Sequence, residues 1–366
     1  MNKLILYLRN FDWLVFFSVL LLIAFGLAEI YSISLGQGNV DLPGFKKQVF
    51  FVLAGLVLLF LFSFVNYHNL RFFSNYFYII GVIILGLVLA FGSTIRGTKG
   101  WFNFAGFNFQ PVEFIKIVLI IFLARYFSDI SLRISQIKHL VISGIGALIL
   151  FGLVLAQPDF GSGLLLFAVW LSMLAMAGFR KRYFIILFAV MAIAAVLAWS
   201  FFFKPYQKER VMTFLNPSAN SLDQGYNVTQ AMIAVGSGRL FGRGIGFGSQ
   251  SQLKFLPESS TDFIFAVISE ELGFLGVVLV IIFFSIFFFK TLANIRNIKD
   301  DFGIFFILGA LSLIFVEMFV NIGMNIGLLP VVGIALPFIS YGGSSMVANL
   351  VMVGIMENII IRSKIR

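Results

Sequence analysis

The chain has 366 residues, of which 60% are hydrophobic and 11% charged, and its mean hydropathy is +1.02. A soluble domain of this size needs more polar surface, so the soluble globular classes are excluded. The net charge is +10, but the basic residues are scattered among the ends of apolar runs, which argues against nucleic-acid binding. The absence of cysteine excludes disulfides and thiol chemistry.

Apolar runs near 20 residues recur along the chain, and each is long enough to cross ~30 Å of hydrocarbon as a helix. The first is too long for a signal-peptide core and lacks a small-residue cleavage site, so it is expected to remain as a span. The predicted spans are 12–34, 47–65, 76–92, 111–129, 139–157, 160–178, 183–203, 263–289, 303–325 and 341–361. We therefore expect an all-α integral membrane protein with ten transmembrane helices, forming a single domain over 1–366.

The distribution of Lys and Arg predicts the orientation. With the N-terminus inside, fifteen of these residues lie at cytoplasmic ends of the spans and four lie in short outer loops. The four are Lys46, Lys47, Arg96 and Lys99. This bias places both termini in the cytoplasm and makes the polar segment 204–262, between the seventh and eighth spans, a large extracytoplasmic loop.

The fourth span opens with Pro111, which suits a first helical position, and it carries Glu113 and Lys116 three residues apart on one face. Taken alone, these two residues are best interpreted as a self-neutralising pair that orients the helix. Charge at membrane depth is costly and often marks function, so a functional role stays open. The break between the fifth and sixth spans rests on the short stretch 157–161, which contains Asp159.

The long polar segment holds two features that invite a functional interpretation. A glycine-rich run over 236–248 contains Arg239 and Arg243, but it lacks the ending of a P-loop and the context of a dinucleotide fold. We interpret it as a tight re-entrant or surface loop that suggests an anionic ligand. Asp262 follows a hydroxyl-rich stretch, 259–261, as expected both for a helix cap with acid in the first turn and for a catalytic acid.

Polar residues also lie within the apolar spans. Glu317, Asn321 and Asn325 recur every fourth residue in the ninth span, so they share a face that must meet other helices. Interhelical hydrogen bonding is the favoured interpretation of this stripe. Glu29 in the first span and the adjacent acids 270–271 in the eighth have no assigned role at this point.

A set of motifs resembles one known family from the first span to the last and in order. The motifs are Gln157–Gly161, Phe214–Pro217, Gly225–Gln230, Ile233–Gly238, Gly248–Leu253, Phe255–Glu258, Thr261–Phe265, Glu270–Gly273, Gly327–Gly333 and Ser340–Ser345. Together they resemble the SEDS family, which comprises RodA, FtsW and their sporulation relatives. The short N-terminus before Phe11 is more similar to that of the elongation type, RodA, than to the division type.

The resemblance implies a peptidoglycan glycosyltransferase that polymerises lipid II at the outer face of the bacterial cytoplasmic (inner) membrane. It implies a class B penicillin-binding protein, a crosslinking transpeptidase, as partner. The family's catalytic acid carries over to Asp262, and its Glu and Lys of the fourth span carry over to Glu113 and Lys116. The family has His before its Thr-Asp pair, whereas this chain has Ser260. Histidine is therefore not required there, or its role has moved.

On this interpretation the donor is a glycan on undecaprenyl diphosphate and the acceptor is the 4-hydroxyl of an incoming lipid II. One displacement inverts the anomeric centre with a single base, and Asp262 is the expected base. The candidates for the diphosphate are Lys116, Arg210, Arg239 and Arg243; Asp159, Glu258 and Ser344 complete the expected substrate-binding set. Mg²⁺ or Mn²⁺ could assist the diphosphate, but no dedicated ligand set is visible, so no metal site is assigned.

Two alternatives come from other functional classes. A transporter that flips lipid II would spread its important residues through the depth of the bundle, and a scaffold would only hold its partner. The polymerase instead predicts a cluster at the outer face, where Glu113, Lys116, Asp159, Arg210 and Asp262 are expected. An anchored transpeptidase needs a lipid-facing helix surface, for which we choose the aromatic residues of the eighth and ninth spans. They are Phe283, Phe284, Phe287, Phe288, Phe289, Phe302, Phe305 and Phe306.

Overall fold

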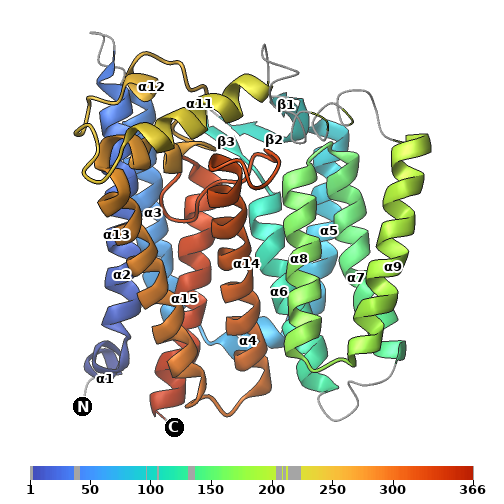
Figure 1. Ribbon diagram of the computed structural model, residues 1–366. Coiled ribbons are helices and arrows are strands. Elements are labelled where there is room, and N and C mark those ends of the chain that lie inside the picture. The colour runs from blue at the N-terminus through green and yellow to red at the C-terminus, as the bar shows by residue number, and fades with distance from the viewer. Residues whose placement is uncertain are drawn as a thin grey trace.

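The computed structural model describes residues 3–36, 42–95, 97–104, 107–130, 137–202, 208, 212 and 224–365. The apolar runs fold as helices, and the long ones stand side by side in one bundle (Figure 1). The first helices are α1 (Lys3–Asn10), α2 (Trp13–Ser34), α3 (Pro43–Phe64), α4 (Tyr67–Phe72), α5 (Ser74–Phe91), α6 (Val112–Asp129), α7 (Ile137–Ala156) and α8 (Phe160–Met176). They are followed by α9 (Lys181–Leu197) with a π-helical continuation η2 (Ala198–Phe202), α11 (Gln224–Ser237), α12 (Ser249–Gln252), α13 (Ile264–Ile295), α14 (Asp301–Asn325) and α15 (Gly343–Ile365).

A helix lies at each of the ten predicted ranges, and both termini lie at the same end of the bundle, as an even number of crossings requires (Figure 1). Within the described residues, seven helices are long and apolar enough to span a membrane: α2, α3, α5, α7, α13, α14 and α15. Of the others, α6 carries four charged side chains, and α8 and α9 have 17 residues each. The multi-pass helical fold is confirmed, and the exact number of spans stays a prediction.

The expected outer loop 93–110 holds a small sheet that was not predicted. Strands β1 (Ser93–Ile95), β2 (Thr98–Phe104) and β3 (Phe107–Phe109) pair antiparallel in the order β1-β2-β3. Two of these strands have three residues, which is too short to show the alternation of polar and apolar residues that marks a strand in sequence.

The centre of the bundle is formed by α15, which packs mainly along α3. At Gly354 a Cβ atom would lie 2.4 Å from the Leu59 carbonyl oxygen, so only glycine permits this close approach. α14 packs against α6 and α8, and α13 packs against α2. α9 lies at the edge of the bundle (Figure 1). The most buried surfaces therefore belong to α14 and α15, the helices that flank the candidate site described below.

The predicted loop 204–262 contains regular structure in its described part. α11 and α12 lie across the same end of the bundle as the small sheet, opposite both termini (Figure 1). α13 continues to Ile295, beyond the expected end at 289, and it is broken at Gly273, whose φ is 67° and ψ −162°. The treatment of the chain as one domain with an extracytoplasmic loop stays a prediction.

The aromatic surface proposed for the partner is largely wrong. Phe284, Phe287, Phe302, Phe305 and Phe306 are all buried. Of the other three, Phe289 is exposed and Phe283 and Phe288 are half-buried. Phenylalanine is so frequent in this chain that its position along a helix does not distinguish the core face from the lipid face.

An exposed aromatic surface does exist on these two helices, but it uses other residues of α14. Phe315 and Phe319 are 51% and 58% exposed, and their rings stack with centroids 6.2 Å apart. The ring of Phe288 in α13 lies 5.8 Å from that of Phe315. These three residues form the α13–α14 aromatic surface.

Candidate active site

The segment between α14 and α15, residues 326–342, is the frame on which the candidate site is built. It forms no regular helix or strand, yet residues such as Phe338 are buried. The fully buried Gln48 of α3 donates from Nε2 to the Ser340 carbonyl (3.2 Å), and its Oε1 accepts from the Gly342 amide (3.1 Å). Irregular backbone inside a membrane bundle needs such partners, because lipid supplies none.

Asp262 immediately precedes α13, and its main chain is held by two asparagines. Its carbonyl oxygen accepts from Nδ2 of Asn321 and from Nδ2 of Asn325, both at 3.0 Å. The neighbouring Thr261 carbonyl accepts from Ser340 Oγ at 2.6 Å, which joins the start of α13 to the 326–342 segment. The main chain of Asp262 is therefore fixed from two elements.

The side chain of Asp262 is half-buried, and Asp262 is not the N-cap residue of α13. The N-cap position is taken by Phe263, which makes no side-chain cap, and the Ala266 amide is capped by Asn325 Oδ1 at 3.1 Å. The carboxylate lies beside Gly333, where a Cβ atom would be 3.6 Å from Oδ2. An amide at the start of α13 is thus capped from another helix, by Asn325, and the choice between cap and base for Asp262 stays a prediction.

Glu258 belongs to the same turn as Asp262. Its carboxylate accepts from Thr261 Oγ1 at 3.0 Å, and its carbonyl accepts from the Thr261 amide at 3.1 Å. The φ of Glu258 is 54°, in the left-handed region that non-glycine residues rarely adopt. This conformation turns the chain sharply before α13 and places two carboxylates, those of Glu258 and Asp262, on one short turn.

Lys116 lies between two carboxylates inside the bundle. Its Nζ is 2.8 Å from Glu113 Oε2 in the same helix and 2.6 Å from Glu317 Oε1 in α14. All three side chains are buried, and Glu317 Oε2 has no hydrogen-bond partner. The pair expected from the sequence is therefore a triad with two acids and one base, which ties α6 to α14.

One face of α14 connects this triad to Asp262. Glu317, Asn321 and Asn325 are each four residues apart, so successive side chains are about 6 Å apart along the helix axis. Glu317 contacts Lys116, while Asn321 and Asn325 hold the Asp262 carbonyl. The expected interhelical hydrogen bonds of this stripe are thus present, and they link the two groups of predicted site residues.

Asp159 and Ser344 meet in a second cluster through a residue that was not predicted. Asp159 caps α8 by accepting from the Ser162 amide (3.0 Å), and it also accepts from Gln110 Nε2 (3.4 Å). The main-chain N–H of Gln110 donates to Ser344 Oγ at 2.9 Å. Next to this cluster, a Cβ at Gly161 would lie 2.4 Å from a carbonyl oxygen of the 326–342 segment. Asp159 and Ser344 therefore border the frame that also holds Asp262.

The remaining predicted ligands are not brought to Asp262. Arg239 and Arg243 lie on the glycine-rich loop, and the Arg243 amide donates to the Glu270 carbonyl at 3.0 Å. Glu270 is eight residues beyond Asp262, a distance of about 12 Å along a helix. This arrangement does not favour direct contact between these two arginines and a ligand held at Asp262. Arg210 lies outside the described residues.

The two acids without an assigned role anchor this glycine-rich loop. Glu270 Oε1 accepts from the Gln250 amide at 3.0 Å. Glu271 Oε2 accepts from the Gly246 amide (2.9 Å) and from Ser32 Oγ of α2 (2.5 Å). In the sequence, this anchor could have been recognised from two adjacent acids in an apolar run that are followed closely by Gly273, where the helix breaks.

The described part of the chain contains no group of three or more His, Cys, Asp or Glu side chains that could hold a metal ion. Glu258 and Asp262 lie on the same turn. Two carboxylates do not make a dedicated site, so no reaction step is assigned to a metal.

The comparisons with known proteins agree with this arrangement. A family model described as "Cell cycle protein", covering FtsW, RodA and SpoVE, matches residues 12–365. The chain belongs to this family, the SEDS family. Its multi-pass helical fold is therefore that of a SEDS protein.

Several relatives match this SEDS protein over most of both lengths. Stage V sporulation protein E of Bacillus subtilis is 34% identical over 360 residues, covering 95% of this chain and 96% of the relative. Peptidoglycan glycosyltransferase MrdB of Escherichia coli K12 is 34% identical over 344 residues, covering 93% and 91%. Peptidoglycan glycosyltransferase RodA of Treponema pallidum is 29% identical over 422 residues, covering 96% and 97%.

Two solved structures show the same fold. One comes from work on the structural coordination of polymerization and crosslinking by a peptidoglycan synthase complex; it has a TM-score of 0.81, 27% identity, and coverage of 96% of this chain and 98% of the other. The crystal structure of the Rod shape determining protein RodA of Thermus thermophilus has a TM-score of 0.72, with 24% identity and 96% of each chain covered.

Proposed function

We propose that this protein is a peptidoglycan glycosyltransferase that polymerises lipid II at the outer face of the bacterial cytoplasmic membrane, with both termini in the cytoplasm. The observation that carries this proposal is Asp262, whose main chain is clamped by Asn321 and Asn325 while another residue caps the helix. A carboxylate whose main chain is held in place at a helix start suits a general base. The names of the relatives support the reaction class.

The proposed reaction is a single displacement at the anomeric carbon of the donor glycan. The Asp262 carboxylate accepts the proton of the acceptor 4-hydroxyl as that oxygen bonds to C1. The bond between C1 and the diphosphate oxygen breaks at the same time, so an α-linked donor gives a β-linked product. One base and no covalent intermediate suffice, by analogy with inverting glycoside chemistry.

Lys116 and Glu113 act in this proposal as positioning residues. The Lys116 ammonium is buried and lies within 2.8 Å of two carboxylates, so direct contact with an external diphosphate is not part of this proposal. Its effect passes through Glu317 to the face of α14 that holds the Asp262 carbonyl. Arg210 remains a candidate for the diphosphate, while Arg239 and Arg243 are placed about two helical turns of α13 away.

The first test is Asp262→Asn in the purified protein supplied with lipid II and a class B partner. Asparagine keeps the size of the side chain but cannot accept the proton, so polymer should be lost while the melting temperature in detergent stays near wild type. The matched control is Asp300→Asn, which alters an acid that caps another helix, α14, and it should leave polymer formation unchanged. Near-normal polymer from Asp262→Asn would refute the assignment.

The transporter alternative makes a different prediction for the same variant. A flippase would move lipid II across vesicles without forming polymer, and Asp262→Asn would leave that movement intact. Gln48, Asn321, Asn325 and Asp262 converge on one irregular segment at one end of the bundle, which favours chemistry at a surface over a pathway through the depth. Polymer formation by the purified chain with its partner separates the two.

We also propose that a class B penicillin-binding protein docks through its membrane helix on the α13–α14 aromatic surface. The structural relative comes from a complex in which polymerization and crosslinking are coordinated, which supports a crosslinking partner. The surface formed by Phe288, Phe315 and Phe319 offers stacked and edge contacts to such a helix. An elongation role, as the short N-terminus suggests, belongs to this proposal too.

A further inference from the structure

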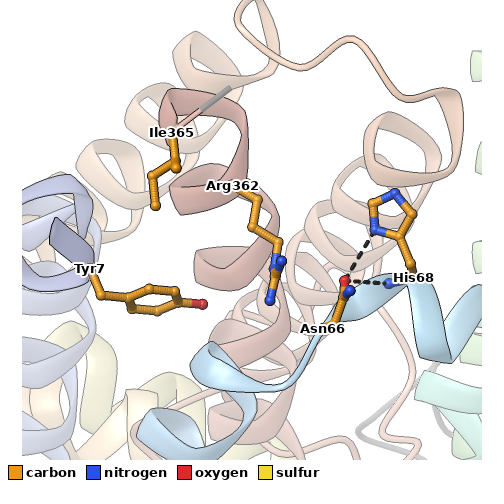
Figure 2. A pocket seen from close by; sticks show the side chains of 5 residues that line it. All are labelled: Tyr7, Asn66, His68, Arg362 and Ile365. Atoms are coloured by element: carbon orange, nitrogen blue, oxygen red, sulfur yellow. Dashed lines mark hydrogen bonds between the residues drawn. The ribbon is translucent and has the colours of Figure 1, made fainter. Parts of the chain in front are cut away.

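A cavity of about 330 Å³ opens at the end of the bundle that carries both termini, opposite the candidate active site (Figures 1 and 2). It is lined by Tyr7 of α1, by Asn66 and His68 at the start of α4, and by Arg362 and Ile365 at the end of α15. None of these residues takes part in the proposed polymerisation. The cavity therefore needs an explanation of its own.

A buried amide, that of Asn358, holds two of the residues that line this cavity. Asn358 is fully buried, and its Nδ2 donates to the Tyr7 hydroxyl (2.7 Å) and to the Ser63 carbonyl. Its Oδ1 accepts from Arg362 Nε (3.1 Å) and from the Tyr67 amide (3.2 Å). All donor and acceptor groups of this amide are used, so Tyr7 and Arg362 are held in place before any ligand binds.

Arg362 lines the cavity and, unlike the nearby Lys290 and Lys364, is not neutralised by an acid of the described residues. Lys290 and Lys364 each lie 3.6 Å from Asp12, whereas Arg362 forms no ion pair in the part of the chain that the structure describes. Figure 2 shows its guanidinium between Tyr7 on one side and Asn66 with His68 on the other. With Nε engaged, the two terminal nitrogens remain to bind an anion, and their planar fork suits phosphate oxygens.

Asn66 and His68, on the other side of the cavity, are also held by hydrogen bonds. Asn66 Oδ1 accepts from the His68 amide (3.2 Å) and lies 3.1 Å from His68 Nδ1, which fixes the imidazole ring at the rim. Burial raises the pKa of the Tyr7 hydroxyl above its usual value, so this group stays neutral beside the guanidinium. The cavity thus carries positive charge from Arg362 and no negative charge among its lining residues.

Apolar surface continues from this cavity along α3. The Tyr7 ring stacks on Phe64 at 4.6 Å, and Leu61, Phe64 and Val65 are 54%, 43% and 44% exposed. A phosphate ligand with an attached acyl chain would use both the cation and this apolar strip, whereas free phosphate would use only the cation. Basic pockets between membrane helices on the cytoplasmic side are typical sites for anionic lipid headgroups.

We propose that this cavity binds the phosphate headgroup of an anionic phospholipid from the cytoplasmic leaflet. Arg362 contacts the phosphate, and the exposed end of α3 contacts an acyl chain. The bound lipid joins α1 to the end of α15, which are otherwise linked at this cavity through Asn358. This site rests on the proposed orientation of the chain but not on its enzymatic activity.

The test uses the full-length protein in detergent and measures its melting temperature during titration with short-chain phosphatidylglycerol. Arg362→Gln should weaken the apparent affinity by about tenfold or more, since a charge-assisted hydrogen bond is lost. Arg296→Gln is the matched control, because Arg296 is an exposed cation at the same end and outside the cavity. It should leave the titration unchanged. Equal affinity in Arg362→Gln and wild type would overturn the proposal.

Further arms separate the sources of phosphate. Inorganic phosphate and short-chain phosphatidylcholine should have little effect on the melting temperature. An effect of inorganic phosphate equal to that of phosphatidylglycerol would assign the cavity to free phosphate. An equal effect of phosphatidylcholine would show that an anionic lipid is not required. Either result overturns the lipid assignment. If Arg362→Gln does not fold, photolabelling of the wild-type protein with a headgroup-diazirine phosphatidylglycerol decides. Adducts are expected on α1, α4 and the end of α15, and their absence there would refute the site.

Discussion

Removing the charge of Lys116 tests whether it positions the site or contacts the substrate. Lys116→Met leaves Glu113 and Glu317 facing each other inside the bundle without a cation. Breaking a buried ion pair by removing one partner costs about 3–5 kcal/mol, because an uncompensated charge stays buried. Here two carboxylates are left, so we expect the upper part of that range, with a large fall in melting temperature in detergent and loss of polymer.

A triple variant separates the loss of folding from a loss of chemistry. Glu113→Gln, Lys116→Met and Glu317→Gln together remove all three charges while keeping the side-chain sizes. Replacement of a whole buried ionic group by neutral residues is often nearly neutral in stability, so the melting temperature should return close to wild type. If Lys116 only positions α14, this variant should regain at least about a tenth of the polymer yield, measured with lipid II and the partner.

The outcome that would refute this reasoning is a triple variant that melts like wild type but makes no more polymer than Asp262→Asn. That result would mean that the Lys116 charge itself contacts the diphosphate. Exchanging Glu113 with Lys116 does not separate the two hypotheses. The exchange places a carboxylate at position 116, against Glu317, so it is expected to fail on either hypothesis.

Three further predictions follow from the packing. Gly161→Ala, whose Cβ would lie 2.4 Å from a carbonyl oxygen, should lower melting temperature and polymer yield, whereas Gly152→Ala, with open space around its Cβ, should change neither. Asn325→Ala uncaps α13 and releases one bond to the Asp262 carbonyl, so about 1–2 kcal/mol of stability and most activity should be lost. A photo-crosslinker at Phe319 should capture the partner's membrane helix, and crosslinks found only from α9 would contradict the docking surface.

The long helices of the bundle were predictable because each one coincides with a continuous apolar run in the sequence. The triad was not, because Glu317 lies 201 residues from Lys116 and only the packing of α14 on α6 brings them together. The position of Arg239 and Arg243 relative to Asp262 was not predictable for a related reason. The path of their loop depends on side chains of α13 and α2, such as Glu271 and Ser32. These residues are far apart in the sequence, so their spacing does not predict the contact.

Asp262 shows how far a motif can be interpreted without packing. Its sequence context fitted a cap and a base equally well, because both need an acid at a helix start. The structure adds Asn325, which caps α13 from another helix and also holds the Asp262 carbonyl. A cap supplied from a distant element cannot be recognised from the residues around Asp262.

The two faces of α14 connect the proposed partner to the proposed base. Phe315 and Phe319 are exposed, while Glu317 and Asn321, each two residues further along, are buried. Two residues correspond to about 200° around a helix, so the aromatic surface and the polar stripe lie on nearly opposite sides. A partner helix that shifts or steadies α14 would therefore act on the asparagines that hold the Asp262 carbonyl. Weak activity alone and strong activity with the partner follow from this arrangement, because the position of the base depends on a helix that the partner contacts.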